Sequence, residues 1–187
     1  MCKVVEKNYA ALPPFNEREI LRYAGVKGAA DENTLALLQE CLQACEGAFS
    51  YRACYVTLSK ADLFALLPSA KESLAFAKFL DGKDEAVLFA ATVGLGVDRL
   101  IHRYASVSPV KALFFQAIGA ERIEALCDEF CKELGLKKRF SPGYADLALE
   151  TQRGIFAALG CEKRLGISLT NSLLMSPTKS VTAIAVQ

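Results

Sequence analysis

The sequence predicts an α+β fold, a single domain in which an antiparallel or mixed β-sheet is packed by several helices. Three observations predict it. The 187 residues are 52% hydrophobic and 23% charged, a balance typical of a globular chain with a buried core. Helix-like and strand-like segments follow one another without a strand–helix–strand rhythm, which argues against a parallel sheet. No repeat, linker or low-complexity stretch divides the chain. We therefore expect one domain over residues 1–187, with a helical and strand part over 1–85 and a second part over 86–187.

The chain is expected to open with an extended segment over residues 1–15, because a proline pair near the end of this segment is incompatible with a helix. Asn16, with a glutamate three residues later, forms a capping-box pattern that predicts a short helix ending at Tyr23. The next helix is expected to begin at Asp31, where apolar residues start to recur at helical spacing, and to end near Gly47.

Residues 49–58 are rich in tyrosine and β-branched residues, which predicts a strand or a hairpin arm. Ser69 with Glu72 forms a second capping-box pattern, so a helix is expected to follow and to stop at an Asp-Gly pair. The inner face of that helix is expected to carry four apolar residues, namely Leu74, Phe76, Ala77 and Leu80. The uninterrupted apolar run 86–93 predicts a buried strand.

Gly94 and Gly96 follow that strand and precede a helical pattern, which invites a dinucleotide-binding interpretation. The third glycine of such a fingerprint is missing, because Arg99 occupies its place, and no acidic residue ends a second strand about twenty residues on. A plain strand-to-helix turn is the better interpretation. Asp98 then supplies favourable charge at the helix N-terminus, and the single histidine, His102, is expected to be structural.

Ser108 before a proline is a strong helix start, and the apolar stripe that follows predicts a long helix reaching about Leu134. After a loop, a further helix is expected over 150–159, where a glycine ends it. The last two strands are expected at 167–170 and 180–186. The sequence thus predicts about six helices and four or five strands.

The charge pattern excludes some partners. Lys and Arg number 22 against 21 Asp and Glu, and no basic stripe stands out, so we expect no nucleic-acid partner held by bulk charge. No stretch reaches the ~20 uninterrupted apolar residues that a membrane span needs, so no membrane partner is expected. No phosphate loop, nucleophile elbow or zinc spacing is present. We expect neither a bound metal nor a catalytic acid–base pair.

Seven cysteines are present, an odd number, and no secretory leader is recognisable. These features predict free thiols and a cytoplasmic location. Two pairs stand four residues apart, Cys41 with Cys45 and Cys127 with Cys131, which places each pair on one helix face. A metal site is the alternative for that spacing, but buried apolar cysteines are the simpler interpretation.

The segment Arg139-Phe-Ser-Pro-Gly-Tyr144 differs in kind from these patterns. Arginine offers a planar fork for a carboxylate, such as the one that an amino-acid ligand presents. Gly143 lets the backbone approach a ligand, and Tyr144 offers an aromatic face suited to an adenine or a sulfonium cation. From residue chemistry alone, an ordinary Pro-Gly turn followed by a core tyrosine is the alternative.

The Arg-x-x-Pro-Gly-Tyr pattern, in which Arg139 is separated from the proline by two residues, resembles the ligand loop of the activation domain of cobalamin-dependent methionine synthase. The closing segment, Gly166-Ile-Ser-Leu-Thr-Asn-Ser-Leu-Leu-Met-Ser-Pro-Thr-Lys-Ser-Val181, resembles that family's Gly-x-x-Leu-Thr-Glu-Ser, Met-x-Pro and Ser-Val elements in order and spacing. The long helix before the loop fits as well. The chain is thus similar to a free-standing form of that domain.

The resemblance implies an S-adenosylmethionine-binding module. In the family, the domain docks on a cobalamin-binding methionine synthase or related corrinoid protein, which supplies the cobalamin. S-adenosylmethionine and an electron from a flavodoxin-type donor then regenerate methylcobalamin from cob(II)alamin. For this chain the resemblance implies reactivation in trans of a methionine synthase that lacks its own activation domain. It implies that Arg139 binds the ligand carboxylate, that backbone at Ser141 and Gly143 contacts the amino acid or adenosine, and that Tyr144 packs beside the sulfonium or adenine.

Two positions depart from the family pattern. Ala145–Ala148 stands where larger members carry a Cys-Pro pair, and Asn171 replaces the usual glutamate. Glu129 and Glu133, on the helix before the loop, are the nearest candidates for the acidic partners of the ligand's amino group. The alternative functions are a non-catalytic module that docks on a corrinoid protein without S-adenosylmethionine, and a plain scaffold or homodimer with a vestigial loop.

Overall fold

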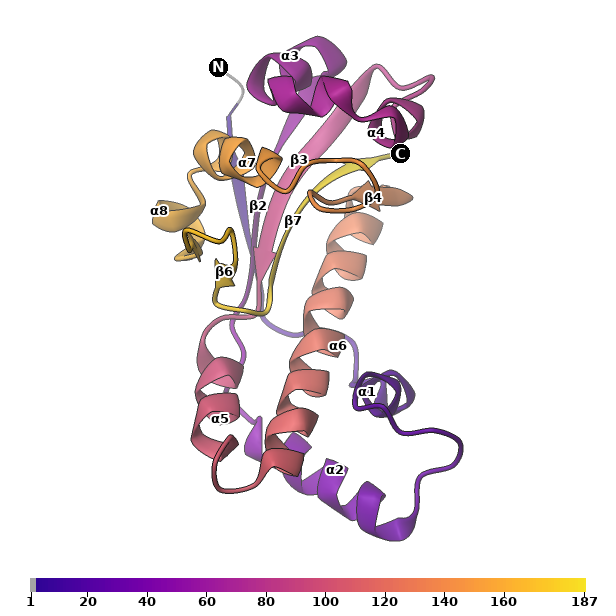
Figure 1. Cartoon of the computed structure of the whole chain (residues 1–187), viewed down its shortest axis with the longest axis vertical. Helices are drawn as coiled ribbons and strands as arrows, with labels where there is room; N and C mark the ends of the chain where they lie inside the picture. The colour runs from indigo at the N-terminus through magenta and orange to yellow at the C-terminus, as the bar shows by residue number, and fades with distance from the viewer. Residues whose placement is uncertain (1–2) are drawn as a thin grey trace.

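The computed structural model describes residues 3–187 and confirms the predicted class, a sheet packed by helices (Figure 1). Five strands form the main sheet in the order β1-β2-β3-β7-β4, and every neighbouring pair is antiparallel. The strands are β1 (Val5–Tyr9), β2 (Tyr51–Ser59), β3 (Glu85–Thr92), β4 (Lys138–Phe140) and β7 (Ser180–Val186). A second, two-stranded sheet pairs β5 (Ser168–Leu169) with β6 (Met175–Ser176).

Eight α-helices and one 3₁₀ turn accompany the sheets in the described part of the chain. They are α1 (Glu17–Tyr23), α2 (Glu32–Ala44), α3 (Lys60–Leu66), the 3₁₀ turn Pro68–Glu72, α4 (Leu74–Phe79), α5 (Gly96–Tyr104), α6 (Pro109–Glu133), α7 (Thr151–Leu159) and α8 (Cys161–Leu165). Most of the expected helices are confirmed. Asn16 caps α1 by accepting the Glu19 N–H, and Asp31 caps α2 by accepting the Thr34 N–H.

The capping prediction at Ser69 is wrong. Pro68 begins a 3₁₀ turn there, and the Ser69 hydroxyl contacts the Thr151 hydroxyl at 3.1 Å. Helix α4 begins later and is capped by Ser73, whose side chain accepts the Phe76 N–H. Of the four residues expected on the inner face of this helix, Phe76 and Leu80 are buried, whereas Leu74 and Ala77 are exposed.

Several short elements were not predicted. The first strand, β1, pairs along the outer side of β2, although its own sequence is polar. Helices α3 and α8 have seven and five residues, too few to show a clear apolar period. A strand was predicted at 167–170, but only the two residues of β5 form one, because its partner β6 also has two residues. Tertiary packing stabilises elements of this length, so sequence periodicity does not reveal them.

Strict alternation along the strands divides the core into two layers. On β3, Val87, Phe89 and Ala91 face the long helix α6, whereas Leu88 and Ala90 face the opposite layer. The second layer is covered by α3, α4, α7 and α8, of which α3 and α4 lie at the upper end of the molecule in Figure 1. Both sheet faces are therefore buried, which explains why β3 reads as a continuous apolar run.

Helix α6 connects the two ends of the molecule. Its 25 residues span about 37 Å at 1.5 Å per residue. Its C-terminal half packs on the sheet, and its N-terminal half lies among α1, α2 and α5 (Figure 1). Gly119 lies at the middle of α6, where the stem of Lys179 covers it. One apolar cluster continues along the helix from Ile20 and Leu38 to Phe130.

Candidate functional site

Strand β4 separates the first two residues of the predicted ligand loop. The sequence predicted a loop at Arg139 and Phe140, but both lie in the edge strand β4, where they pair with Ala185 and Ile184 of β7. Neighbouring strand residues point to opposite faces. Arg139 consequently faces α6, and Phe140 faces α4, where its ring lies 5.5 Å from Phe76.

On the α6 face, the guanidinium of Arg139 lies between two carboxylates. It forms an ion pair with Glu124 and donates a hydrogen bond of 3.0 Å to Asp128 Oδ1. Glu124 and Asp128 are four residues apart, so both project from the same face of α6. The arginine side chain is 27% exposed. The result is a partly buried cluster in which one positive group is flanked by two negative ones.

Two thiols lie beside this cluster without competing for the arginine. Burial raises the pKa of the Cys127 thiol. Burial also raises the pKa of the Cys131 thiol, although the adjacent Arg139 acts in the opposite direction. Both thiols are therefore neutral at physiological pH. The carboxylates are the anionic partners of Arg139.

Residues 141–147 form a compact double turn after β4. The Tyr144 N–H donates to the Ser141 carbonyl at 3.1 Å, and the Gly143 N–H donates to the Leu147 carbonyl at 2.8 Å. Gly143 has φ +83°, a conformation that few other residues adopt, and a Cβ there would approach Leu149 Cδ1 to 3.2 Å. The Gly143 N–H is thus occupied within the loop, which leaves the Ser141 and Gly143 backbone to contact a ligand through other atoms or after a local change.

Asp146 fastens this loop to α4. Its carboxylate accepts hydrogen bonds from the Ser73 hydroxyl, from the Leu74 N–H at 2.8 Å and from the Ala75 N–H at 3.2 Å. The hydrogen bond from Ser73, followed by those from the two backbone groups, holds the pKa of Asp146 below its usual range. The sequence Ala145–Ala148, which departs from the family pattern, therefore contains a helix-capping carboxylate.

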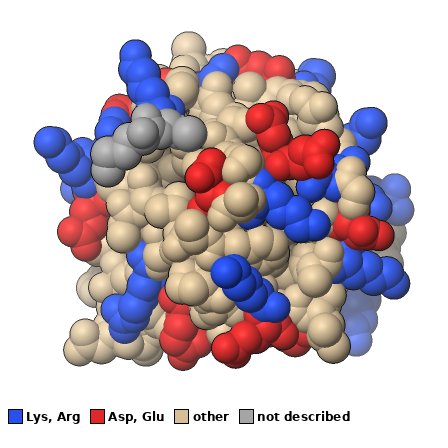
Figure 2. Space-filling view, turned by 90° about the horizontal axis from the view of Figure 1, so that it is seen from above, with Lys and Arg blue, Asp and Glu red and all other residues tan. Residues whose placement is uncertain are grey.

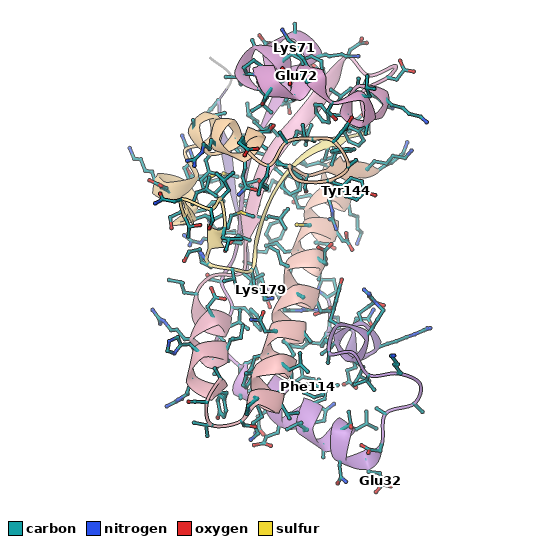
Figure 3. The ribbon with its side chains drawn as sticks, viewed as in Figure 1. Glu32, Lys71, Glu72, Phe114, Tyr144 and Lys179 are labelled. Atoms are coloured by element: carbon teal, nitrogen blue, oxygen red, sulfur yellow. The ribbon has the colours of Figure 1, made fainter. Side chains whose placement is uncertain are left out.

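Tyr144 is the most exposed aromatic residue of the loop. Its side chain is 68% exposed, and its ring meets Phe140 edge-on with centroids 5.4 Å apart. Figure 3 shows Tyr144 at the sheet end of α6, far from Phe114 at the other end. Arg139 belongs to the edge strand, and Tyr144 follows that strand closely in the sequence. Tyr144, however, packs on Phe140, which faces α4. A ligand that contacts both side chains has to cross the edge of the sheet.

A groove of about 420 Å³ runs along α6 beside the Arg139 cluster. Glu124 and Asp128 line it, and so does Glu129, one of the two predicted acidic candidates. Its other lining residues are Pro13, Pro14, Asn16, Glu19, Tyr23, Glu121, Arg122, Ala125 and Lys132. The other candidate, Glu133, accepts a hydrogen bond of 2.9 Å from Tyr9 and pairs with Lys7. The acidic pair that contacts Arg139 was missed, although its i,i+4 spacing on the helix before the loop was a readable signal.

The inner wall of this groove is fixed by a buried ion pair. Glu121 and Arg122 contact each other and are both almost fully buried. Glu121 accepts the Asn16 N–H at 3.1 Å, and Arg122 donates to the Pro13 carbonyl at 2.8 Å. The Arg122 guanidinium also lies 4.1 Å from the centre of the Phe15 ring. Half of the predicted capping box at α1 is therefore replaced, because Glu121 takes the Asn16 N–H that Glu19 was expected to accept.

The closing segment folds against α7 and α5. Gln152 donates to the Leu173 carbonyl at 2.9 Å, and Leu173 has φ +64°. Asp98 accepts the Thr178 N–H at 2.8 Å as well as the Thr178 hydroxyl. Asp98, expected only to favour the helix dipole, thus also holds the closing segment in place. Asn171 is exposed on the turn between β5 and β6.

Five cysteines are buried and Cys131 is half-buried; Cys2 lies outside the described residues. Within residues 3–187, no group of three or more His, Cys, Asp or Glu side chains is placed to hold a metal ion. Over the same range, no helix combines the length and apolar character that a bilayer crossing requires.

No family model matches the chain, and no curated protein matches its sequence. A solved structure does match in three dimensions. It is the crystal structure of the MetH reactivation domain bound to AdoHcy. The match covers 98% of this chain and 78% of that one, with a TM-score of 0.64 and 16% sequence identity. The chain therefore has the fold of that domain, as the resemblance in its loop and closing segment predicted.

Proposed function

We propose that the chain is an S-adenosylmethionine-binding reactivation module. It acts in trans in the reductive methylation of cob(II)alamin on a cobalamin-dependent methionine synthase that lacks its own activation domain. Two assignments go beyond the shared fold: S-adenosylmethionine is the ligand of this chain, and a separate corrinoid protein is its partner. The similar solved domain is bound to AdoHcy, the molecule that S-adenosylmethionine becomes when it gives up its methyl group.

The observation that carries the proposal is the arrangement of Arg139 between Glu124 and Asp128. The amino-acid end of S-adenosylmethionine carries one carboxylate and one ammonium group. A guanidinium flanked by carboxylates matches this pair of charges, because the guanidinium binds the carboxylate and a neighbouring carboxylate accepts the ammonium. Asp128, whose side chain is 74% exposed, releases Arg139 to the ligand's carboxylate and accepts the ammonium group instead. Glu124 holds the guanidinium during that exchange.

Tyr144 supports the other end of the ligand. Its exposed ring, braced edge-on by Phe140, offers a flat surface to an adenine or to the sulfonium. Asp146 fixes the position of this ring indirectly, because it ties the loop to α4. We assign the backbone at Ser141 and Gly143 to contacts with the amino acid or adenosine between these two anchors.

The role of the chain in the reaction is to position S-adenosylmethionine. The chemistry at cobalt comes from the cobalamin that the partner protein holds, with an electron from a flavodoxin-type donor. Arg139 and Tyr144 fix the two ends of S-adenosylmethionine, which restricts the direction in which its methyl group points. The face around Tyr144 is open, so a docked partner protein can cover it and exclude water from the methyl group.

Isothermal titration of the purified chain with S-adenosylmethionine tests the ligand assignment. Saturable binding is expected, and its absence at millimolar ligand, with the chain shown to be folded by circular dichroism, removes the mechanism. The second step is a pull-down with a cobalamin-loaded methionine synthase that lacks an activation domain. Capture that strengthens with S-adenosylmethionine supports reactivation in trans.

The second candidate is a non-catalytic module that docks on a corrinoid protein after losing S-adenosylmethionine binding. Two observations favour it: Arg139 already has two carboxylate partners, and the Gly143 N–H is already hydrogen-bonded. Capture of the cobalamin-loaded partner that is unchanged by S-adenosylmethionine, together with a flat titration, identifies this function.

A further inference from the structure

A second groove lies on the opposite side of the edge strand from the Arg139 cluster. It has a volume of about 540 Å³ and lies between α4 and β4. Its lining residues are Ala75, Lys78, Phe79, Asp81, Lys83, Lys137, Lys138, Phe140, Val186 and Gln187. In Figure 1, α4, β4 and the C-terminus lie together on the right of the sheet. The volume falls within the range of sites for small organic molecules.

Positive charge converges on this groove. Lys78 comes from α4 and Lys83 from the turn before β3. Lys137 directly precedes β4, and Lys138 is its first residue. In the described part of the chain, none of these four lysines takes part in an ion pair. Asp81 is the acidic side chain among these lining residues, so positive charge is in excess. Seen from above in Figure 2, charges of both signs are interspersed over this end of the molecule.

The floor of the groove is apolar and aromatic. Phe140 is 8% exposed, and its ring centre lies 5.3 Å from that of Phe79. Ala75 and Val186 complete the apolar surface. The two aromatic rings belong to the cluster with Phe76 that anchors α4 to the sheet, so the floor is rigid. A groove lined by an apolar aromatic surface and four lysines suits a molecule with one flat apolar part and several negative charges.

We propose that this groove binds a small organic polyphosphate, such as a nucleoside triphosphate. Lysine ammonium groups act as point charges that suit phosphate oxygens from several directions. Low-dielectric walls strengthen the attraction of like-charged side chains for such an anion. The base or another flat apolar part lies on the Phe79 and Phe140 side. This site takes an anion, whereas the Arg139 cluster faces α6 and is proposed to take a zwitterionic amino acid.

Two of the lysines that line this groove also line a neighbouring groove beside Arg139. Lys137 and Lys138 line a further groove of about 370 Å³ together with Asp128 and Arg139. An anion held by these lysines lies close to the proposed S-adenosylmethionine site, because Lys138 and Arg139 are neighbours on β4. The proposal does not depend on that site, because its residues and the charge of its ligand are different.

Titration of the full chain with GTP at low ionic strength tests the proposal; its base differs from that of S-adenosylmethionine. We expect saturable binding that weakens as salt increases. The double variant Lys78→Gln/Lys138→Gln should raise the GTP dissociation constant at least about tenfold. A control, Lys27→Gln/Lys163→Gln, removes two exposed lysines elsewhere and should change it less than about twofold. Tripolyphosphate should bind more weakly than GTP, because it lacks the apolar part.

Three results overturn the proposal. The first is the absence of GTP binding at millimolar concentration. The second is an equal loss of GTP affinity in the groove variant and the control, which shows that only the overall charge matters. The lysines then serve only to keep the edge strand from pairing with another chain. The third is tripolyphosphate binding as tightly as GTP, which excludes a role for the aromatic floor. A parallel titration with S-adenosylmethionine separates the sites, because the groove variant should leave that binding unchanged.

Discussion

Arg139 on β4 donates a 3.0 Å hydrogen bond to Asp128 on α6, across the junction between the edge strand and the long helix. The bond joins the residue assigned to the ligand's carboxylate to a residue assigned to its ammonium group. Substitutions of Arg139 and of Asp128 should therefore affect the binding of different groups of S-adenosylmethionine.

Replacement of Arg139 by alanine should weaken S-adenosylmethionine binding by at least about 1.5 kcal/mol, because a charged hydrogen-bonded pair is lost. Isothermal titration measures the change. Arg153→Ala removes an exposed arginine from α7 and serves as the control, with no expected effect. An unchanged dissociation constant in Arg139→Ala shows that the arginine only joins β4 to α6.

Replacement of Asp128 by asparagine should weaken S-adenosylmethionine binding by about 1 kcal/mol, because the ammonium group loses a charged acceptor. The same variant should bind methylthioadenosine with unchanged affinity, since that ligand has the adenosine and sulfur but no amino acid. Tighter binding of S-adenosylmethionine to Asp128→Asn is the opposite result. It identifies Asp128 as a competitor for Arg139 and contradicts its assignment to the ammonium group.

Asp146→Asn should lower the urea midpoint at pH 7, because the start of α4 and the loop lose the charged acceptor that joins them. The pKa of Asp146 is lowered in the folded protein, so its stabilisation is present above the unfolded pKa, near 3.9, and is lost as pH falls through the folded value. The difference between wild type and variant should therefore shrink below about pH 4. Urea unfolding at pH 7 and pH 3 checks this; a constant difference contradicts it.

Gly96→Ala should destabilise the fold by about 3 kcal/mol or more, because a Cβ at this position would lie 1.9 Å from the Ala48 carbonyl oxygen. Gly135→Ala provides the comparison. Gly135 has φ +67° with open space around it, so only backbone strain of about 1–2 kcal/mol is expected. Urea unfolding of both variants gives the two values. Similar losses would show that the backbone around Ala48 moves to accept the methyl group.

Glu121→Ala should cost about 3–5 kcal/mol of folding free energy, because it leaves the buried Arg122 without its charged partner. The double variant Glu121→Ala/Arg122→Met should recover part of this loss, since no unpaired charge remains. Chemical denaturation of the three proteins provides the test. A loss below about 1 kcal/mol in the single variant means that Arg122 is satisfied by the Pro13 and Pro14 carbonyls alone.

The sequence predicted the elements whose signals are local. Asn16 and Asp31 mark helix starts because their side chains reach the next backbone N–H groups. The buried strand β3 was readable because both of its faces are covered. Helix α3 and strand β4 were not readable, because seven and three residues are too short for a period to be recognised.

The site was predictable only in part for the same reason. Arg139 and Tyr144 were identified by residue type and spacing. Their separation by the edge strand follows from the alternation of β4, which appears only once that segment is known to be a strand. The pairing of Arg139 with Glu124 depends on where α6 packs against the sheet, and the role of Asp146 depends on the position of α4. Contacts between segments distant in sequence cannot be read from one sequence.

The length of α6 has a consequence for how the molecule opens. Because one apolar cluster follows this helix from the sheet to α1 and α2, neither end can unfold alone without exposing residues that the other end buries. We therefore expect the slowest amide hydrogen exchange along the middle of α6, around Gly119 and Ile123, with similar opening free energies on both sides.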